Sequence, residues 1–261
     1  TWGGFCDESA NAAAGEAYYG GRVQVIGEPG ALYSQVHSVD ANSLFPAMML
    51  RPYPDISKVR QVAPTIQNLE AILNDPDRLC WANVRLEGGE RSPRFLPNTN
   101  DEGRRDWDSL VFDGWACEPE IRHALENGYE LVQLRGLYCA YTIEPFSAFV
   151  RSFYQLRLEY QGANDPREFA IKIVLNSLYG RFGMRDICMR IDQPEKVGEI
   201  LEAGEWVEEY ELNFYDGHGG RWPYLEEIEP SKKANSNWFG FASFVTSYAR
   251  VELARVIAAA G

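Results

Sequence analysis

A lysine, an asparagine and a tyrosine fall on one side of the segment Ala170–Gly180. At about 100° per residue of an α-helix, Lys172, Asn176 and Tyr179 lie within about 60° of one another. The helix then presents a cation, an amide and a phenol in one line. The rest of its surface is apolar and comprises Phe169, Ile171, Ile173, Val174, Leu175 and Leu178. A packed helix with a single wet face is the simpler interpretation of a lone lysine and asparagine at this spacing.

The start and end of this helix are well marked. Asp165 is placed to cap it, Pro166 occupies the first helical position, and Glu168 is placed for a capping box. Gly180 is typical of a helix end. Upstream, residues 145–160 also have helical periodicity, with an apolar side made of Phe146, Phe149, Val150 and Phe153. A turn at residues 162–164 joins the two segments, so we expect two antiparallel helices.

The remaining pattern predicts further elements. We expect strands at residues 23–26, 79–86 and 129–134, and helices at residues 121–125 and 237–260. Residues 205–210 and 213–217 suggest the two arms of a twisted hairpin.

A carboxylate near the start of the chain has a setting suited to a metal-bound triphosphate. The segment Val36–Pro46 indicates a short strand ending at Asp40, followed by a helix that begins near Ser43 and stops before Pro52. In that arrangement the carboxylate can bind the metal, and the free amides at the helix start can bind phosphate oxygens. An aspartate that only caps a turn is the alternative.

The composition predicts a folded chain with an acidic segment. Of the 261 residues 45% are hydrophobic and 13% aromatic, which excludes a disordered chain. The net charge of −13 opposes binding to nucleic acid, because phosphate contacts need lysine and arginine. Between Asp192 and Glu229, however, twelve acidic and two basic side chains carry −10 of that charge. We expect this segment to be solvated surface, or else a docking surface for a basic partner.

Two other classes of protein are excluded by the sequence. The five cysteines contain no C-x-x-C pair and therefore indicate neither a zinc site nor a disulfide framework, so we expect reduced, mostly buried thiols. No apolar run is long enough to span a membrane, and the first residues lack the features of a signal peptide.

Two motifs resemble those of family B DNA polymerases. Lys172, Asn176, Ser177, Tyr179 and Gly180 match the K-x-x-x-N-S-x-Y-G motif of that family's fingers helix. Asp40 and the residues after it match D-x-x-S-L-Y-P, the family's first catalytic motif, with phenylalanine where tyrosine is usual. The motifs occur in the family's order, about 130 residues apart, and so support each other.

Weaker matches extend the resemblance to the protein-primed group of bacteriophages and linear plasmids. Tyr18, Gly20 and Gly21 resemble the template-contacting Tyr-x-Gly-Gly motif that joins the exonuclease and polymerase modules there. Thr246 and Arg250 resemble the T-x-x-A/G-R motif that binds the primer strand. The family's next element carries a D-T-D motif, which is not found within these 261 residues.

The resemblance implies a role for each of these residues. Asp40 and the carbonyl of Ala41 would hold magnesium in a two-metal site completed by an aspartate absent here. The nucleotide-binding residues would be Ser43, Leu44, Phe45, Arg157, Lys172, Asn176 and Tyr179, of which Lys172 would bind the phosphates and Phe45 would press against the sugar. A solvated arginine is the alternative interpretation of Arg157.

The implied fold class is α+β: a partial polymerase palm with a fingers helical hairpin and two terminal-protein-region insertions. The boundaries are residues 1–50 for the start of the palm with the first catalytic motif, 51–144 for the first insertion, 145–181 for the fingers, 182–235 for the second insertion, and 236–261 for a palm helix.

We therefore expect a fragment of a protein-primed family B DNA polymerase that adds deoxynucleotides to a primer 3′-hydroxyl. Its implied partners are template and primer DNA, deoxynucleoside triphosphates and a priming terminal protein, with no membrane. It would work inside the cell, in the host cytoplasm for a virus- or plasmid-encoded enzyme. With only one metal-binding carboxylate, this chain alone should not extend a primer. One alternative is a non-catalytic module that binds DNA or terminal protein, and another is an acidic interaction protein whose motifs are coincidental.

Overall fold

The computed structural model describes residues 8–22, 32, 41–89, 95–99, 105–107, 109–183, 190–191, 194–203, 210–217, 220–227 and 239–260. It divides the chain into a larger unit, Thr1–Gly183 with Trp238–Gly261, and a smaller unit, Met184–Asn237. The strands predicted at residues 23–26 and 36–40, Asp40 included, lie outside the described residues. None of the helices among the described residues is long and apolar enough to cross a membrane.

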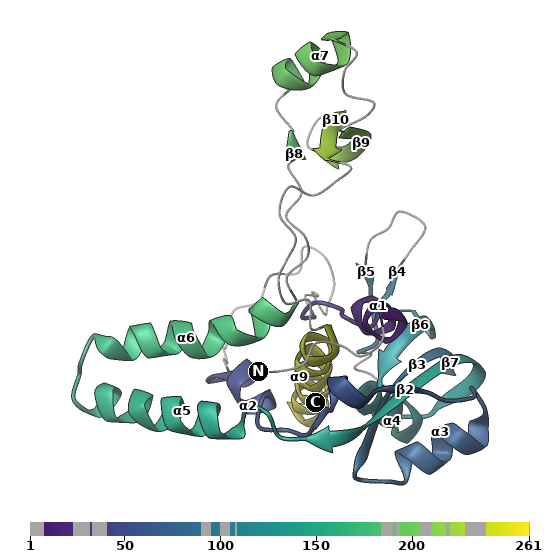
Figure 1. Ribbon diagram of the computed structural model, residues 1–261, viewed down its shortest axis with the longest axis vertical. Coiled ribbons are helices and arrows are strands. Elements are labelled where there is room, and N and C mark those ends of the chain that lie inside the picture. Colours follow the sequence, from purple (N-terminus) through teal and green to yellow (C-terminus); the bar gives the residue numbers. More distant parts are fainter. Residues whose placement is uncertain are drawn as a thin grey trace. The chain divides into compact units, whose positions relative to one another are not determined.

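An antiparallel sheet of five strands forms one layer of the larger unit (Figure 1). Its two long strands, β3 (Arg78–Gly88) and β7 (Tyr129–Ile143), are paired along their length. On the other side of β3 lies β6 (Val111–Cys117), while the short strands β1 (Tyr53–Pro54) and β2 (Arg60–Gln61) pair with the end of β7. The strands predicted at residues 79–86 and 129–134 are confirmed, and the second is longer than predicted.

Strand β3 shows why the sheet needs helices on both faces. Its residues alternate between two apolar cores: Trp81 belongs to one, and Cys80 and Ala82 belong to the other. Both faces are buried in this half of the strand, so it reads as a continuous apolar run. Further along, Asn83 and Arg85 are only partly buried on the Trp81 face. That face is therefore covered by helices at one end only.

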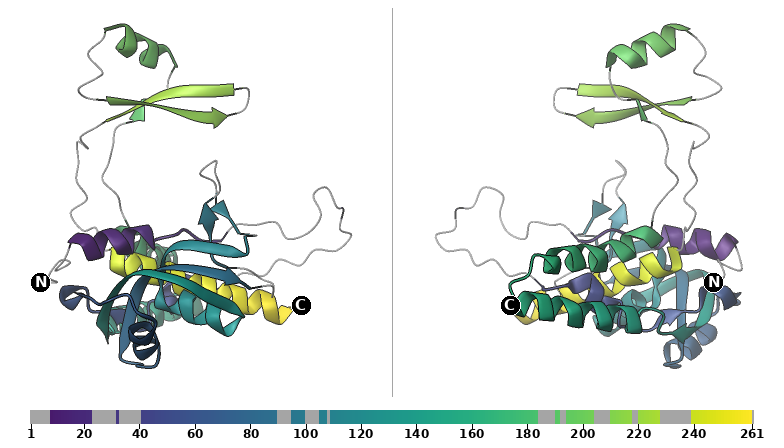
Figure 2. Two further views of the ribbon diagram at one scale, coloured as in Figure 1. Left: turned by 90° about the vertical axis from the view of Figure 1, so that its right-hand side faces the viewer. Right: turned by 60° about the vertical axis from the view of Figure 1, so that its left-hand side comes forward.

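The long helix α9 (Phe239–Ala260) lies between the sheet and a pair of helices (Figures 1 and 2). Its prediction at residues 237–260 is confirmed. Phe241, Phe244 and Val245 are fully buried, and Trp81 of the sheet packs edge-on to Phe244. The Trp81 indole also donates a hydrogen bond of 3.1 Å to the Ser243 hydroxyl. Helix α9 is thus the centre of the core that joins the two layers.

The pair of helices is the predicted hairpin, α5 (Ser147–Gly162) and α6 (Arg167–Phe182) (Figure 1). Asn164 takes the left-handed conformation in the turn, with φ of 51°. At the base of the hairpin, Phe146 and Phe182 lie 5.1 and 5.5 Å from the ring of Phe241, measured between centroids. An aromatic cluster therefore attaches the hairpin to α9.

Several shorter elements complete the larger unit. They are α1 (Glu8–Glu16), α2 (Leu44–Met48), the 3-10 turn η1 (Ile56–Lys58), α3 (Ile66–Leu73), β4 (Asn98–Thr99), β5 (Arg105–Asp106) and α4 (Glu118–Glu126). Helix α4 includes the predicted helical residues 121–125. Helices α1 and α3 were not predicted, because α1 is a run of small residues and the Thr65 cap that starts α3 was overlooked.

The described residues of the smaller unit form a three-stranded antiparallel sheet and one helix. The strand order is β8 (Arg190–Ile191), β10 (Gly220–Glu227), β9 (Tyr210–Gly217), and the helix is α7 (Pro194–Ala203). We predicted a hairpin here, with residues 213–217 as its second arm. They belong instead to its first strand, because the chain reverses between Gly217 and Gly220, where β9 meets β10.

We predict that Phe241→Ala lowers the free energy of unfolding by about 3 to 5 kcal/mol, because it removes a fully buried ring that joins α9 to the hairpin. Phe169→Ala is the matched control, since that ring on α6 is 64% exposed and its loss should change stability by less than about 0.5 kcal/mol. Urea unfolding of both variants measures the difference. Equal losses would contradict the aromatic attachment.

Candidate functional site

The start of α2 is tied to the helical hairpin by one arginine. Arg157 of α5 donates from Nη1 to the hydroxyl of Ser43 at 2.6 Å, and from Nε to Glu168 of α6, also at 2.6 Å. The Arg157 side chain is only 15% exposed. It is therefore not the solvated arginine of the alternative interpretation. The structure brings Ser43 and Arg157, which are 114 positions apart in sequence, into direct contact.

A stacked pair of rings makes a second contact between α2 and the hairpin. The rings of Phe45 and Tyr179 lie 4.2 Å apart between centroids, with their planes inclined by 23°. Both side chains, with neighbouring Leu44, pack against the core that surrounds α9. Four of the predicted nucleotide-binding residues, Ser43, Phe45, Arg157 and Tyr179, are thus paired across the same junction.

Lys172 and Asn176 lie on the exposed side of α6. The apolar residues beside them are not all packed: Phe169, Ile173 and Val174 are 64%, 50% and 41% exposed. Leu175, by contrast, is buried against the core. The packed helix of the simpler interpretation is therefore wrong for much of α6, whose wet surface extends well beyond one stripe.

The bounds and the cap of α6 differ from the prediction. The helix begins at Arg167, with Pro166 as its N-cap residue, and it continues past Gly180 to Phe182. Asp165 does accept a hydrogen bond of 2.9 Å from the backbone of Arg167, as expected of a capping residue. The Glu168 carboxylate, however, accepts from Arg157 instead of completing a capping box. A guanidinium within reach is the stronger donor, because both partners are charged.

The predicted metal ligands are described only in part. Asp40 lies outside the described residues, and Ala41, which follows it, is exposed. Within the ranges that the structure describes, no three histidine, cysteine, aspartate or glutamate side chains gather as a metal site would require. The contribution of Asp40 and Ala41 to a magnesium site stays a prediction.

The predicted template-binding segment leaves α1 and is exposed at its glycines. Gly20 and Gly21 are exposed, and a Cβ added at either would meet nothing within 4 Å. Tyr18 packs at the end of α6, where a Cβ on Gly183 would lie 2.5 Å from its ring. A glycine is therefore needed at position 183 for this approach. The open backbone at Gly20 and Gly21 is compatible with close approach of a strand.

The predicted primer contacts of α9 face inward, which corrects the sequence-based expectation. Arg250 is 1% exposed; its Nε donates to Glu120 of α4 at 2.8 Å, and its Nη1 donates to the carbonyls of Tyr19 and Gly20 at 2.5 and 2.9 Å. Thr246 is also buried, and its hydroxyl donates to the carbonyls one turn back in α9. Arg250 therefore holds the segment at Tyr19 and Gly20 against α9, the central helix of the core.

Three residues of the site were not recognised as functional from the sequence. Glu120, fully buried, is the counter-charge of Arg250, and Glu168 is that of Arg157. Tyr19 lies between the predicted motif residues Tyr18 and Gly20 in the sequence. Its side chain is buried, and its hydroxyl donates to the Trp115 carbonyl at 3.0 Å. No local signal marks the pairing of Glu120 or Glu168 with an arginine, since each arginine lies in another element.

Burial lowers the reactivity of three cysteine thiols and one tyrosine phenol in the larger unit. It raises the pKa of Cys80, Cys117 and Cys139, which are free and buried, so the thiols stay protonated. This agrees with the predicted reduced, buried cysteines; Cys6 and Cys188 lie outside the described residues. Burial also raises the pKa of Tyr248, whose hydroxyl donates to the Pro52 carbonyl at 2.7 Å.

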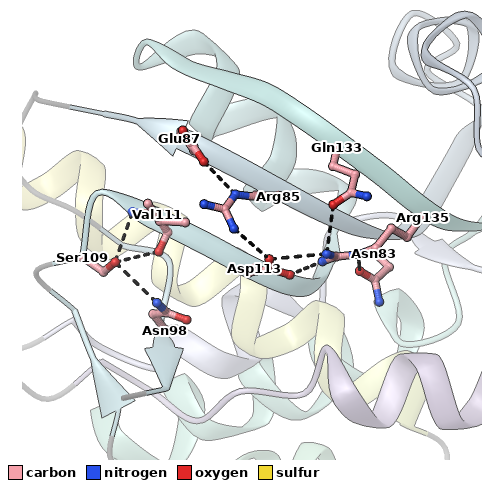
Figure 3. Close-up of polar contacts among 9 residues, drawn as sticks. All are labelled: Asn83, Arg85, Glu87, Asn98, Ser109, Val111, Asp113, Gln133 and Arg135. Carbon is pink, nitrogen blue, oxygen red and sulfur yellow. Dashed lines mark hydrogen bonds and ion pairs between the residues drawn. The ribbon is translucent and has the colours of Figure 1, made fainter. Parts of the chain in front are cut away.

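The uncovered end of the sheet carries a network of ion pairs (Figure 3). Arg135 donates to Asn83 at 2.8 Å, to Gln133 at 3.2 Å and to Asp113. Arg85 also forms an ion pair with Asp113, with 3.6 Å between its Nη1 and the Asp113 Oδ2. The network spans β3, β6 and β7 and lies in the predicted first insertion. The positive charges of Arg85 and Arg135 are largely balanced by Glu87 and Asp113 within the same network.

This arrangement of an antiparallel sheet, a central helix and a helical hairpin is similar to part of a solved DNA polymerase structure. The structure of Phi29 DNA polymerase complexed with primer-template DNA is similar over 98% of this chain and 41% of that chain, with a TM-score of 0.58 and 17% sequence identity. The complex that also contains incoming nucleotide substrates gives a TM-score of 0.57 and 16% identity. At such identities the likeness concerns the fold.

Sequence comparison defines the family. Residues 9–215 match the family described as DNA polymerase type B, organellar and viral, and the chain belongs to that family. A probable DNA polymerase of Agaricus bitorquis is 25% identical over 202 residues, covering 73% of this chain, and one of Neurospora intermedia is 28% identical over 181 residues, covering 64%. The chain spans 24% and 17% of the length of these two relatives.

We predict that Glu120→Gln lowers the free energy of unfolding by about 3 kcal/mol or more, because it leaves the buried Arg250 charge without its counter-charge. The matched control is Glu252→Gln, since Glu252 is 36% exposed and lies 3.8 Å from Arg51; its loss should be at most about 1 kcal/mol. Urea unfolding at neutral pH compares them. A loss for Glu120→Gln no larger than the control's would show that the buried pair is not needed.

Proposed function

We propose that these residues are the palm and fingers part of a protein-primed family B DNA polymerase, which adds deoxynucleotides to a primer 3′-hydroxyl on a DNA template. The observation that carries the proposal is the contact between Ser43 and Arg157. It joins the segment after Asp40 to the helix pair that bears Lys172. This contact supports a single site that combines the catalytic motif and the nucleotide-binding motif, although the two are remote in sequence.

The donors expected at the metal site fit magnesium chemically. Asp40 offers a carboxylate oxygen and Ala41 a carbonyl oxygen, both of which are hard ligands suited to Mg²⁺. Magnesium bound there would neutralise the charge that develops on the phosphates during transfer. Two such ligands do not complete a coordination shell, so further carboxylates must come from elsewhere in the polymerase.

The residues on the hairpin and α2 have separable roles in this proposal. Lys172, exposed on α6, binds the nucleotide's phosphates as a point charge, and Arg157 is a second phosphate ligand. Asn176 and Tyr179 line the nascent base pair. Phe45, stacked on Tyr179, packs against the sugar and excludes a 2′-hydroxyl.

The DNA-binding part rests on the segment that leaves α1. Tyr18, Gly20 and Gly21 contact the template strand, and the two exposed glycines allow its backbone to approach. Arg250 supports this contact from beneath, through the carbonyls of Tyr19 and Gly20, and does not touch the primer itself.

The remaining parts would serve the priming protein. We assign residues 51–144 and 182–235 to the two insertions that contact the terminal protein, and the second of these largely coincides with the smaller unit at 184–237. Its acidic residues suit a basic partner. The place of action is inside the host cell, in the cytoplasm for a virus- or plasmid-encoded enzyme and in the organelle for an organellar one.

We predict that Lys172→Ala in the polymerase raises the KM for deoxynucleotides roughly 30-fold, because losing a charge-assisted phosphate contact costs about 2 kcal/mol. DNA binding should be nearly unchanged, since the side chain serves the nucleotide. Arg167→Ala is the matched control, because that cation on the same helix is 67% exposed and paired with Asp165. Single-nucleotide incorporation and a DNA-binding titration measure both quantities. An unchanged KM with weakened DNA binding would refute the proposed role.

We also predict that Phe45→Val relaxes the rejection of ribonucleotides. A hydroxyl clash of about 3 to 4 kcal/mol corresponds to roughly 10² to 10³-fold in kcat/KM, and valine removes the ring that causes it. Phe45→Tyr keeps the ring and should retain the discrimination. The ratio of kcat/KM for matched deoxy- and ribonucleotides, measured for each variant, gives the discrimination. If valine leaves that ratio as it was, the sugar is selected elsewhere.

A further inference from the structure

Arg157 is held by a carboxylate at the place where the proposed function needs it for phosphate. The Arg157–Glu168 ion pair is 2.6 Å long, and the two side chains are 15% and 23% exposed. Arg157 connects the pair to Ser43. A carboxylate and a phosphate oxygen are equivalent acceptors for a guanidinium, so the two compete for the same donors.

Glu168 also lies close to the other phosphate ligand. It precedes Lys172 by four positions on α6, which places the two residues on one face of the helix, about one turn apart. Nucleotide phosphates bound between Lys172 and Arg157 would be repelled by a carboxylate in this position. Either the nucleotide displaces Glu168 from Arg157, or Glu168 weakens nucleotide binding for as long as the ion pair persists.

Ser43 orients the guanidinium from the side of α2. It adopts a left-handed conformation, with φ of 54°, and its hydroxyl makes no cap to α2 but accepts from Arg157. A cavity of about 590 Å³ between α2 and α5 reaches Ser43, but Arg157 and Glu168 are not among its lining residues. The ion pair is instead reached at its own exposed edge, where the two side chains are 15% and 23% exposed. Phosphates that arrive there would meet a cation that Ser43 already orients.

We propose that Glu168 is a positioning residue that occupies Arg157 in the nucleotide-free enzyme and is displaced from it by the phosphates of the incoming nucleotide. When pyrophosphate leaves, the carboxylate pairs with Arg157 again. Glu168 thus keeps the cation ordered between cycles and sets the affinity for both triphosphate and pyrophosphate. This inference rests on the proposed function, in which Arg157 is a phosphate ligand.

The opposite role makes the opposite prediction. If Glu168 only oriented Arg157 toward the phosphates, it would stay paired in the nucleotide complex, and removing its charge would weaken nucleotide binding. If it competes with the phosphates, removing its charge strengthens binding. The sign of the change in KM therefore separates the two roles.

The test uses Glu168→Gln in the polymerase, because glutamine keeps an acceptor oxygen for Arg157 and removes only the charge. We expect the KM for deoxynucleotides to fall on the order of fivefold, the scale of a partly exposed ion pair. The KM for pyrophosphate in the reverse reaction should fall similarly. Glu159→Gln is the matched control: it removes the same charge from α5, where Glu159 accepts only a 3.2 Å hydrogen bond from Gln155.

A double-mutant cycle shows whether Glu168 acts through Arg157. In an Arg157→Met background, or Arg157→Gln if the first does not fold, Glu168→Gln should lower either KM clearly less than it does when Arg157 is present. A raised or unchanged KM for Glu168→Gln overturns the inference, as does an equal fall for Glu159→Gln or an undiminished fall in the double variant. Lys172→Ala tests the proposed function separately, because it removes a proposed phosphate contact and leaves the Arg157–Glu168 pair in place.

Discussion

The buried guanidinium of Arg250 is the contact on which the arrangement of the larger unit depends. A charge removed from water must be paired and hydrogen-bonded, and the partners of Arg250 come from two other parts of the chain. They are Glu120 of α4 and the carbonyls of Tyr19 and Gly20. Helix α4, the segment after α1 and the C-terminal helix are thereby held in one register. The exposed glycines beside this contact owe their position to it.

The hairpin of α5 and α6 is attached to this core in two ways. At its base, the rings of Phe146 and Phe182 pack on Phe241, which is non-directional apolar contact. Further along, Arg157 and the stacked rings of Phe45 and Tyr179 join it to α2 by specific contacts. Lys172 and Asn176 remain on its exposed side. The hairpin is thus firmly held at its base and presents polar groups beside the segment that follows Asp40.

Local pattern was a good guide to elements and a poor one to burial. The periodicity of residues 145–180 and 237–260 predicted three long helices, and the alternation near residues 79–86 and 129–134 predicted the two long strands. Thr246 and Arg250 matched a primer-binding motif by residue type, yet both are buried. Phe169 and Ile173 are apolar, yet they are 64% and 50% exposed. A motif specifies which residues occur, whereas burial depends on what packs against them.

The sequence by itself determined the family resemblance, the main helices and strands, and the set of residues able to bind phosphate, metal and sugar. These depend on side-chain chemistry and on spacing along one element, which can be read within a few turns. Only the tertiary structure decided which of these residues meet. The pairing of Arg157 with Ser43 and Glu168, and of Arg250 with Glu120, joins elements from remote parts of the chain. Such contacts arise from the packing of whole helices around α9, for which no local pattern exists.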